Sequence, residues 1–188
     1  MFSSPSLEPL RATVRERLLP AYAPLGHLTL VYLLGSLISS YTNRADLDLM
    51  MLWQDPAVPA AHHRETVVMG LDERQGISPL VVDHLDIHLE RFVIAEQEYN
   101  VAHLTLAEFE TILQSILQAK RDDTERILDP LVATVGFLYG ETVLDTNGLG
   151  TLWKSKLTTF PPLVKHACRR AVVAHQQEYL SSTLYISN

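Results

Sequence analysis

Two apolar segments separated by a short polar spacer constrain the fold of this chain more than any other part of its sequence. The first, His27–Leu34, is a continuous run rich in residues that favour strands, so we expect a central, buried strand that ends at Gly35. The second, Asp46–Trp53, follows after the polar spacer and predicts another strand. It carries two carboxylates, Asp46 and Asp48, and charges in a largely apolar strand are costly unless something compensates them.

The spacing of these two carboxylates suggests what compensates them. Side chains two positions apart on a strand point to the same side, so Asp46 and Asp48 project together while Leu47 and Leu49 pack on the other face. Mg²⁺ prefers one or two carboxylates together with phosphate oxygens and water. Two such ions about 4 Å apart stabilise the attacking and leaving oxygens of a phosphoryl displacement. The pair therefore indicates a metal site for phosphoryl chemistry.

The residues after the first strand add a phosphate-binding element. A glycine directly after a buried strand lets the backbone approach a ligand, and a helix turn that starts there offers free N–H groups to a phosphate. Gly35 and Ser36 stand at this point, and the Ser36 hydroxyl can donate one more hydrogen bond.

The remaining segments predict an α/β (α+β) fold with a small mixed sheet. Thr105 and Glu108 form the sequence signature of a capping box at a helix start. The segment Ala60–Glu73 is ambiguous, with a weak helix preferred over a strand. The other expected elements are a helix over Ser6–Leu19, strands over Val81–Val93 and Glu98–Leu106, a helix around Ile127–Leu138, a loop with short ordered pieces over Tyr139–Leu157, and a last helix from Thr159 or Pro161. We expect an α/β domain over residues 1–120 and a helical region over 121–188.

Composition narrows the classes of protein. The 188 residues, 47% of them hydrophobic, suffice for a proper core, and no stretch approaches the roughly 20 apolar residues of a membrane span. The net charge of −7 argues against a broad nucleic-acid-binding face. The start lacks a signal-peptide pattern, and the single cysteine, Cys168, excludes an intrachain disulfide. We expect a soluble cytoplasmic protein whose oligomeric state, a homodimer included, stays open.

The segments Leu33–Ser36 and Asp46–Leu49, with nine residues between them, resemble the signature of the polymerase-beta-type nucleotidyltransferase superfamily. Small bacterial members, including kanamycin-type antibiotic nucleotidyltransferases, are the closest in size. The resemblance implies that Asp46 and Asp48 hold Mg²⁺ and that Gly35 and Ser36 hold a nucleoside triphosphate. It also implies a third acidic residue on a neighbouring strand.

A later segment, Tyr139–Leu157, resembles the one that follows the catalytic domain in helical-tailed members of this superfamily. In those proteins a lysine often reaches the nucleotide phosphates. The resemblance therefore nominates Lys154 and Lys156 as phosphate-binding residues.

The third carboxylate is chosen from the alternation in Val81–Val93. This pattern places His84, Asp86, His88 and Glu90 on one face, and we select Asp86 as third metal ligand or general base. Glu90 and Glu98 stay open as alternatives because strand register cannot be read to one residue from sequence. A zinc site made by the two histidines and Asp86 is less favoured, because three ligands from one strand rarely converge on a tetrahedral ion.

These patterns and the resemblance together predict a Mg²⁺-dependent nucleotidyltransferase. It would move a nucleoside monophosphate from a triphosphate, with ATP as the expected donor, to a hydroxyl of an unidentified small molecule or protein. An aminoglycoside is one such acceptor. Two other classes stay open: a nucleotidyltransferase-like antitoxin acting on a helical toxin, and a nucleotide-binding protein without catalysis. We expect no membrane or nucleic-acid partner.

Overall fold

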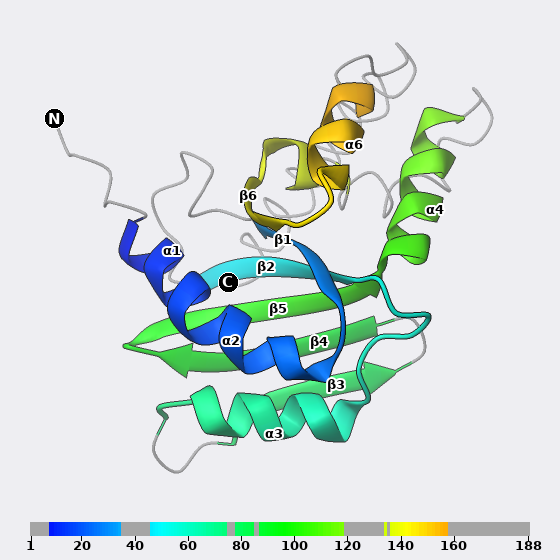
Figure 1. Ribbon diagram of the computed structural model, residues 1–188. Helices are drawn as coiled ribbons and strands as arrows, with labels where there is room; N and C mark the ends of the chain where they lie inside the picture. Colours follow the sequence, from blue (N-terminus) through cyan, green and yellow to red (C-terminus); the bar gives the residue numbers. More distant parts are fainter. Residues whose placement is uncertain are drawn as a thin grey trace, which may run out of the picture.

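The computed structural model describes residues 8–34, 46–74, 78–84, 87–118, 134 and 136–157. Within these ranges thirteen elements are assigned, and Figure 1 labels most of them. In chain order they are α1 (Glu8–Thr13), the π-helical η1 (Val14–Leu18), α2 (Leu19–Tyr22), the 3₁₀ turn η2 (Ala23–Leu25), β1 (Leu28–Leu34), β2 (Asp46–Trp53), α3 (Ala61–Leu71), β3 (Leu80–His84), β4 (Ile87–Ile94), β5 (Gln97–Thr105), α4 (Leu106–Leu117), β6 (Glu141–Asp145) and α6 (Leu149–Leu157).

The strands form one six-stranded sheet in the order β3-β4-β5-β2-β1-β6. Neighbouring strands are antiparallel except β2 and β5, which are parallel. The sheet is therefore mixed, and the predicted α/β (α+β) class is confirmed (Figure 1). The parallel pairing places β5 directly beside the strand that carries Asp46 and Asp48.

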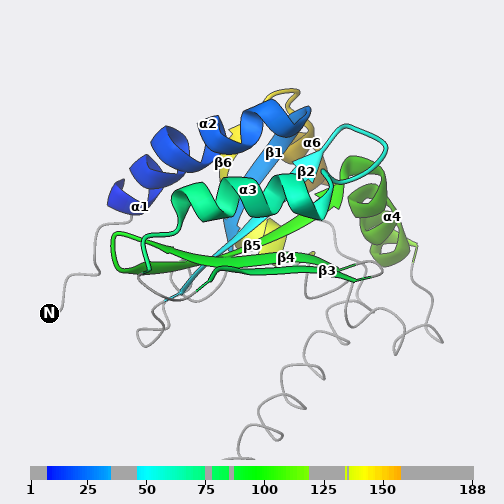
Figure 2. The ribbon, with the colours of Figure 1, turned by 90° about the horizontal axis from the view of Figure 1, so that it is seen from below.

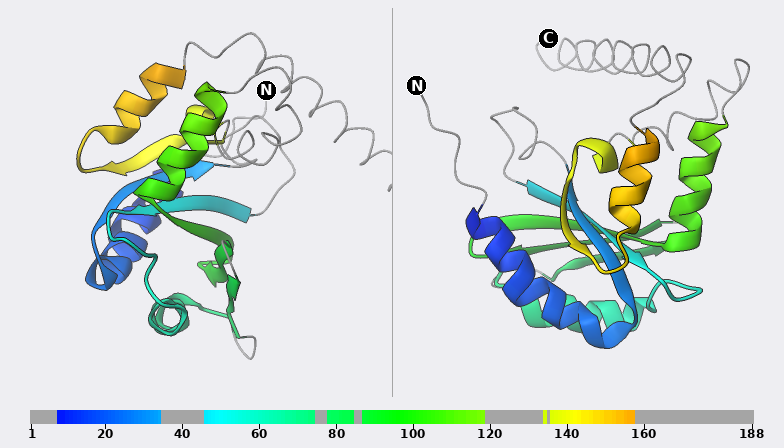
Figure 3. Two further views of the ribbon diagram at one scale, coloured as in Figure 1. Left: turned by 90° about the vertical axis from the view of Figure 1, so that its right-hand side faces the viewer. Right: turned by 45° about the horizontal axis from the view of Figure 1, so that its top comes forward.

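Helices cover both faces of the sheet, but unequally. The N-terminal helices and α3 lie on one face, as Figure 2 shows. On the other face, α4 and α6 lie side by side over the end of the sheet near β1 and β6 (Figure 3). The first face contributes a core that includes Val31, Leu47, Leu49, Phe92 and Tyr99. The second core includes Tyr32, Leu52, Phe109, Phe137 and Trp153. None of the helices within the described ranges is long and apolar enough to span a membrane.

Several predicted elements are confirmed. β2 covers the predicted Asp46–Trp53, and its buried positions Leu47 and Leu49 alternate with the half-buried aspartates. The capping box is present: the Glu108 backbone N–H donates to Thr105 Oγ1 (3.1 Å), and the Thr105 backbone N–H donates to Glu108 Oε2 (2.7 Å). The local residue pattern therefore determines these two elements.

The single strand predicted over Val81–Val93 is wrong. The structure has two antiparallel strands there, with Leu80 opposite Arg91 and His84 opposite Ile87. The period-2 pattern continues from one strand into the next, so alternation alone could not separate a long strand from a hairpin. Residues 85–86, between the two strands, lie outside the described part of the chain.

Over Tyr139–Leu157 the sequence predicts a loop with short ordered pieces; the structure has ordered pieces there, but they are a strand of the sheet, β6, and a helix, α6, that take up most of the segment. All five residues of β6 are half-buried, so the strand shows no alternation that could reveal it. The Asp145 carboxylate accepts hydrogen bonds from the backbone N–H groups of Gly150 (3.3 Å) and Thr151 (3.2 Å), which satisfies donors at the start of α6.

One strand of the sheet, β6, therefore lies beyond the predicted domain boundary at residue 120. β6 is hydrogen-bonded to β1 along Glu141–Asp145, and Trp153 of α6 belongs to the second core. The predicted division into residues 1–120 and 121–188 stays a prediction.

Candidate functional site

The two aspartates of β2 lie on the face of the sheet that also carries the second core. Asp48 is opposite Leu34, the last residue of β1, and Leu34 packs against that core. On the other side of β2, Asp46 is paired with Glu98 and Asp48 with Asn100 of β5. Both aspartates are half-buried. As predicted from their spacing, they project from one face.

An amide from the parallel strand joins the two carboxylates. Asn100 Nδ2 donates to Asp46 Oδ2 and to Asp48 Oδ1, each over 3.1 Å. The Asn100 carbonyl oxygen accepts from Arg91 Nε of β4 over 2.9 Å. A polar chain therefore runs across three neighbouring strands, β4, β5 and β2 (Figure 1). It supplies part of the compensation that the sequence left unexplained, since two hydrogen-bond donors face the paired charges.

The same geometry tests whether these residues fit a divalent cation. One carboxylate oxygen of each aspartate lies 3.1 Å from a single nitrogen, so the two oxygens converge on one point. Converging carboxylate oxygens on a half-buried face are the donor set that Mg²⁺ takes when substrate phosphates supply further oxygens. The donor set fits, although the described residues contain no group of three acidic, histidine or cysteine side chains placed to hold a metal by themselves.

The candidates for the third carboxylate are distributed unevenly. Asp86 lies outside the described residues. Glu98 is on β5, directly opposite Asp46, and its Oε1 lies 3.4 Å from Arg91 Nε. Glu90 points to the opposite face, where it is 2% exposed. Among the described candidates, Glu98 is the one on the strand next to the aspartates.

The proposed phosphate-binding residues are also only partly described. Gly35 and Ser36 lie outside the described residues, but Leu34, to which Gly35 is bonded, is the residue opposite Asp48. Lys154 Nζ donates to the Gly140 carbonyl oxygen over 2.6 Å and lies 5.3 Å from the centre of the Phe137 ring. Burial lowers the pKa of Lys154, while Glu141 and Asp145 act in the opposite direction.

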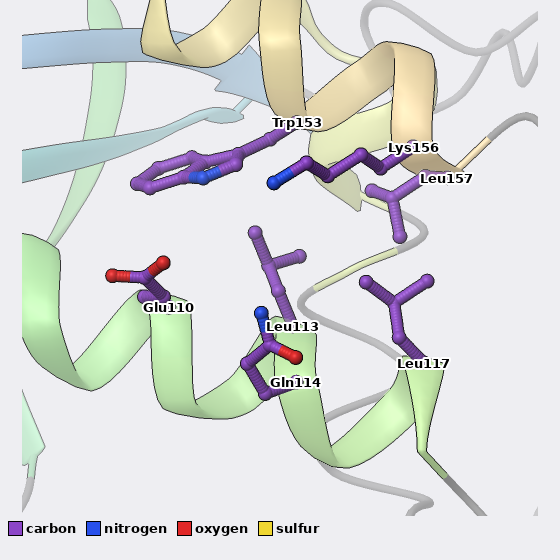
Figure 4. A pocket seen from close by; sticks show the side chains of 7 residues that line it. All are labelled: Glu110, Leu113, Gln114, Leu117, Trp153, Lys156 and Leu157. Atoms are coloured by element: carbon purple, nitrogen blue, oxygen red, sulfur yellow. The ribbon is translucent and has the colours of Figure 1, made fainter.

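Lys154 and the aspartates belong to the same face of the sheet. Lys154 lies against Phe137, which is part of the second core. Its partner Gly140 lies beside Leu33 of β1, because a Cβ on Gly140 would be 2.5 Å from the Leu33 carbonyl oxygen. β1 is the strand next to β2. Lys156 instead lines a small pocket between α4 and α6, opposite Glu110 and Gln114 (Figure 4). Of the two nominated lysines, Lys154 is the one that contacts Gly140, which lies beside Leu33 near the end of β1.

Sequence reasoning missed Asn100 and Arg91. Asn100 follows Glu98 at strand spacing, so it shares that residue's face, but an isolated asparagine in a strand carries no metal-site signal. Its role depends on the parallel register between β2 and β5. That register joins residues more than fifty positions apart, and no local pattern encodes it.

A second polar cluster lies on the opposite face, beneath α2 and α3. The buried Glu90 carboxylate accepts hydrogen bonds from Arg64 Nη1 (3.0 Å) and from the Tyr22 hydroxyl, and His103 Nε2 is 3.1 Å from it. Trp53 Nε1, which can only donate, bonds His103 Nδ1 over 3.1 Å. His103 is therefore neutral with its proton on Nε2, in agreement with burial, which lowers the pKa of His103.

The zinc alternative falls mostly outside the described part of the structure and stays untested. Of its residues, Asp86 is outside the described ranges and the side chain of His84 is not described. His88 Nδ1 contacts the carboxylate of Asp83.

No protein-family model matches the chain, and no curated protein does. Among solved structures, the chain is similar to a nucleotidyltransferase-like protein from Exiguobacterium sibiricum 255-15. The identity is 14%, the TM-score is 0.47, and the match covers 81% of this chain. This chain spans 40% of that protein's length. At this identity and TM-score the likeness assigns no role to any residue.

Proposed function

We propose that this protein is a Mg²⁺-dependent nucleotidyltransferase that uses Asp46 and Asp48 as metal ligands. One observation carries the proposal: the two carboxylates converge on a single point beside the end of β1, immediately before Gly35 and Ser36. The donor would be a nucleoside triphosphate, with ATP as the first choice. The motif resemblance supports this reading, and so does the mixed sheet that sets the two strands side by side.

The reaction transfers a nucleoside monophosphate to a hydroxyl group. The acceptor oxygen forms a bond to the α-phosphorus, the bond from that phosphorus to the bridging oxygen breaks, and pyrophosphate leaves with the bonding electrons. Bound Mg²⁺ would neutralise charge on the triphosphate and on the leaving oxygen. The acceptor's proton would pass to a carboxylate, for which Asp86 and Glu98 are the candidates.

The other residues would bind and orient the donor. Gly35 and Ser36 would offer backbone N–H groups and a hydroxyl to the phosphates. Lys154 would exchange its hydrogen bond to the Gly140 carbonyl for a phosphate oxygen and so neutralise charge. Lys156 is the second candidate for that role. The acceptor class is part of the proposal: the net charge of −7 favours a cationic small molecule such as an aminoglycoside. The proposed location of the protein is the cytoplasm.

A second candidate function is nucleotide binding without transfer. The observation that favours it is the identity of residue 100, because the side chain facing both aspartates is an amide that can neither accept a proton nor add charge. If no carboxylate joins the pair, the site binds a metal–nucleotide complex but lacks a base beside it.

Calorimetric titration with ATP and Mg²⁺ tests the metal assignment. The wild type should bind, and Asp46→Asn/Asp48→Asn should lose that binding. A matched control, Glu65→Gln/Glu96→Gln, also removes two charges but at exposed positions, and should bind as the wild type does. Unchanged binding by the aspartate variant would refute the proposal.

Pyrophosphate release then separates the two functions. A screen across acceptor pools of aminoglycosides, nucleotides, RNA and proteins should show release that depends on one pool and on both aspartates. Binding of ATP and Mg²⁺ without release in any pool supports the non-catalytic candidate.

A further inference from the structure

The amide of Asn100 has only one orientation that satisfies its neighbours. Arg91 can only donate hydrogen bonds, so the atom facing its Nε must be the carbonyl oxygen. Ionised carboxylates can only accept, so the atom facing Asp46 and Asp48 must be the NH₂ group. A flipped amide would set donor against donor and acceptor against acceptor. Arg91 therefore fixes which end of Asn100 meets the carboxylates.

The NH₂ group occupies the place at which a cation would meet both aspartates. Its nitrogen is 3.1 Å from an oxygen of each carboxylate, and its two hydrogens reduce the repulsion between them. Mg²⁺ binds carboxylate oxygens at about 2.0–2.1 Å. An ion between these two oxygens would therefore take the space that the amide hydrogens now fill. A cation that binds between the two oxygens facing Asn100 would therefore exchange the two hydrogen bonds for metal–oxygen contacts.

We propose that Asn100, oriented by Arg91, is a positioning residue that holds Asp46 and Asp48 together in the metal-free protein and is displaced when a divalent cation binds. This inference rests on the proposed function, since it concerns the same carboxylates. The amide makes the metal-free site stable and its cation affinity low. A carboxylate at position 100 would reverse both properties, because it would repel the pair without metal and add a ligand with metal.

The substitution Asn100→Asp tests this with almost no change in size. In EDTA its melting temperature should fall below that of the wild type, and MgCl₂ should raise it by more than it raises the wild type. Calorimetric titration with MgCl₂ alone should show affinity about tenfold or more above the wild-type value. The control Asn147→Asp makes the same change at an exposed turn, where Asn147 Oδ1 accepts from Thr146 Oγ1, and should behave as the wild type in both buffers.

A second variant, Asn100→Leu, keeps the bulk but donates nothing. Its loss of stability should be larger in EDTA than in MgCl₂, because a bound cation can offset the charge that the amide no longer offsets. An equal loss in both buffers overturns the inference, as does an Asn100→Asp variant that matches Asn147→Asp in melting temperature and Mg²⁺ response. If Asn100→Asp does not fold in EDTA but folds in MgCl₂, the inference is supported. If it folds in neither buffer, the comparison of the stability loss of Asn100→Leu in EDTA and in MgCl₂ decides.

These outcomes are distinguishable from failure of the proposed function. The proposed function fails when loss of both aspartates leaves ATP and Mg²⁺ binding unchanged. The inference about Asn100 fails when residue 100 does not influence the Mg²⁺ dependence of stability. The two can also separate in one set of results. If Asn100→Asp increases the Mg²⁺ response but the wild type releases no pyrophosphate, the inference about Asn100 is supported and the transferase activity is contradicted.

Discussion

Arg64 should be among the most costly single side chains to remove from this protein. It lies on α3 with a fully buried side chain. Its Nη1 donates to Glu90 Oε1 over 3.0 Å, its Nε donates to the Pro59 carbonyl oxygen over 2.8 Å, and its Nη2 is 3.2 Å from Asp83 Oδ1. The substitution Arg64→Met keeps much of the apolar stem and removes every donor. Glu90 then stays buried without its cationic partner.

The expected loss follows from that uncompensated charge. Removing one partner of a buried ion pair costs about 3–5 kcal/mol of unfolding free energy. Burial raises the pKa of Glu90, and hydrogen bonds from His103 and Tyr22 together with the Arg64 charge outweigh it, so the net shift is downward. Because two donors remain in the variant, we expect the lower end, about 3 kcal/mol. For a chain of this length that corresponds to a fall of about 6–12 °C in melting temperature.

Urea denaturation and thermal melts followed by circular dichroism measure this loss. Arg17→Met is the control, because the ion pair of Arg17 with Glu73 (2.6 Å) is solvent-exposed and should contribute no more than about 1 kcal/mol. The double variant Arg64→Met/Glu90→Gln should be more stable than Arg64→Met alone, because a neutral amide removes the lone buried charge. The reasoning is wrong if Arg64→Met loses no more than Arg17→Met, or if the losses from Arg64→Met and Glu90→Gln simply add.

Four further predictions concern stability. Burial holds the pKa of His103 below its ordinary value, so the unfolded chain takes up the proton first and stability should fall as pH drops below about 6.5; His103→Gln, neutral at every pH, should flatten that part of the profile in urea titrations from neutral to mildly acidic pH. Gly140→Ala should lose about 1–3 kcal/mol in the same assay, because its Cβ would lie 2.5 Å from two backbone oxygens. Gly70→Ala, with no atom within 4 Å of the new Cβ in the last turn of α3, should instead gain up to about 1 kcal/mol, and a loss there would contradict the helix argument. Thr105→Ala should cost about 1 kcal/mol by removing the cap on α4, whereas an unchanged midpoint would show that the box contributes little.

Elements with a strong local pattern could be predicted from the sequence. The alternation of leucine and aspartate in Asp46–Trp53 defines β2 and places both carboxylates on one face. Thr105 and Glu108 mark the start of α4 because a capping box needs only residues three positions apart. In both cases the interacting groups lie within one turn or one strand of each other.

Elements without such a pattern could not be predicted. Alternation continues from β3 into β4, so the pattern could not separate these two strands. β6 is half-buried throughout and shows no alternation, because it is an edge strand. Glu90 was an open alternative for the third carboxylate, yet the structure turns it toward Arg64 and His103 on the opposite face.

The sequence by itself determined that two carboxylates share a face beside an apolar strand ending in glycine and serine, because side-chain direction along a strand is a local property. Only the tertiary structure decided what meets them. Asn100 reaches the aspartates because β5 runs parallel to β2, and Arg91 reaches Asn100 because β4 lies on the far side of β5. Strand order and register depend on how the whole sheet buries its two cores, and residues 52 and 54 positions apart carry no local trace of that choice.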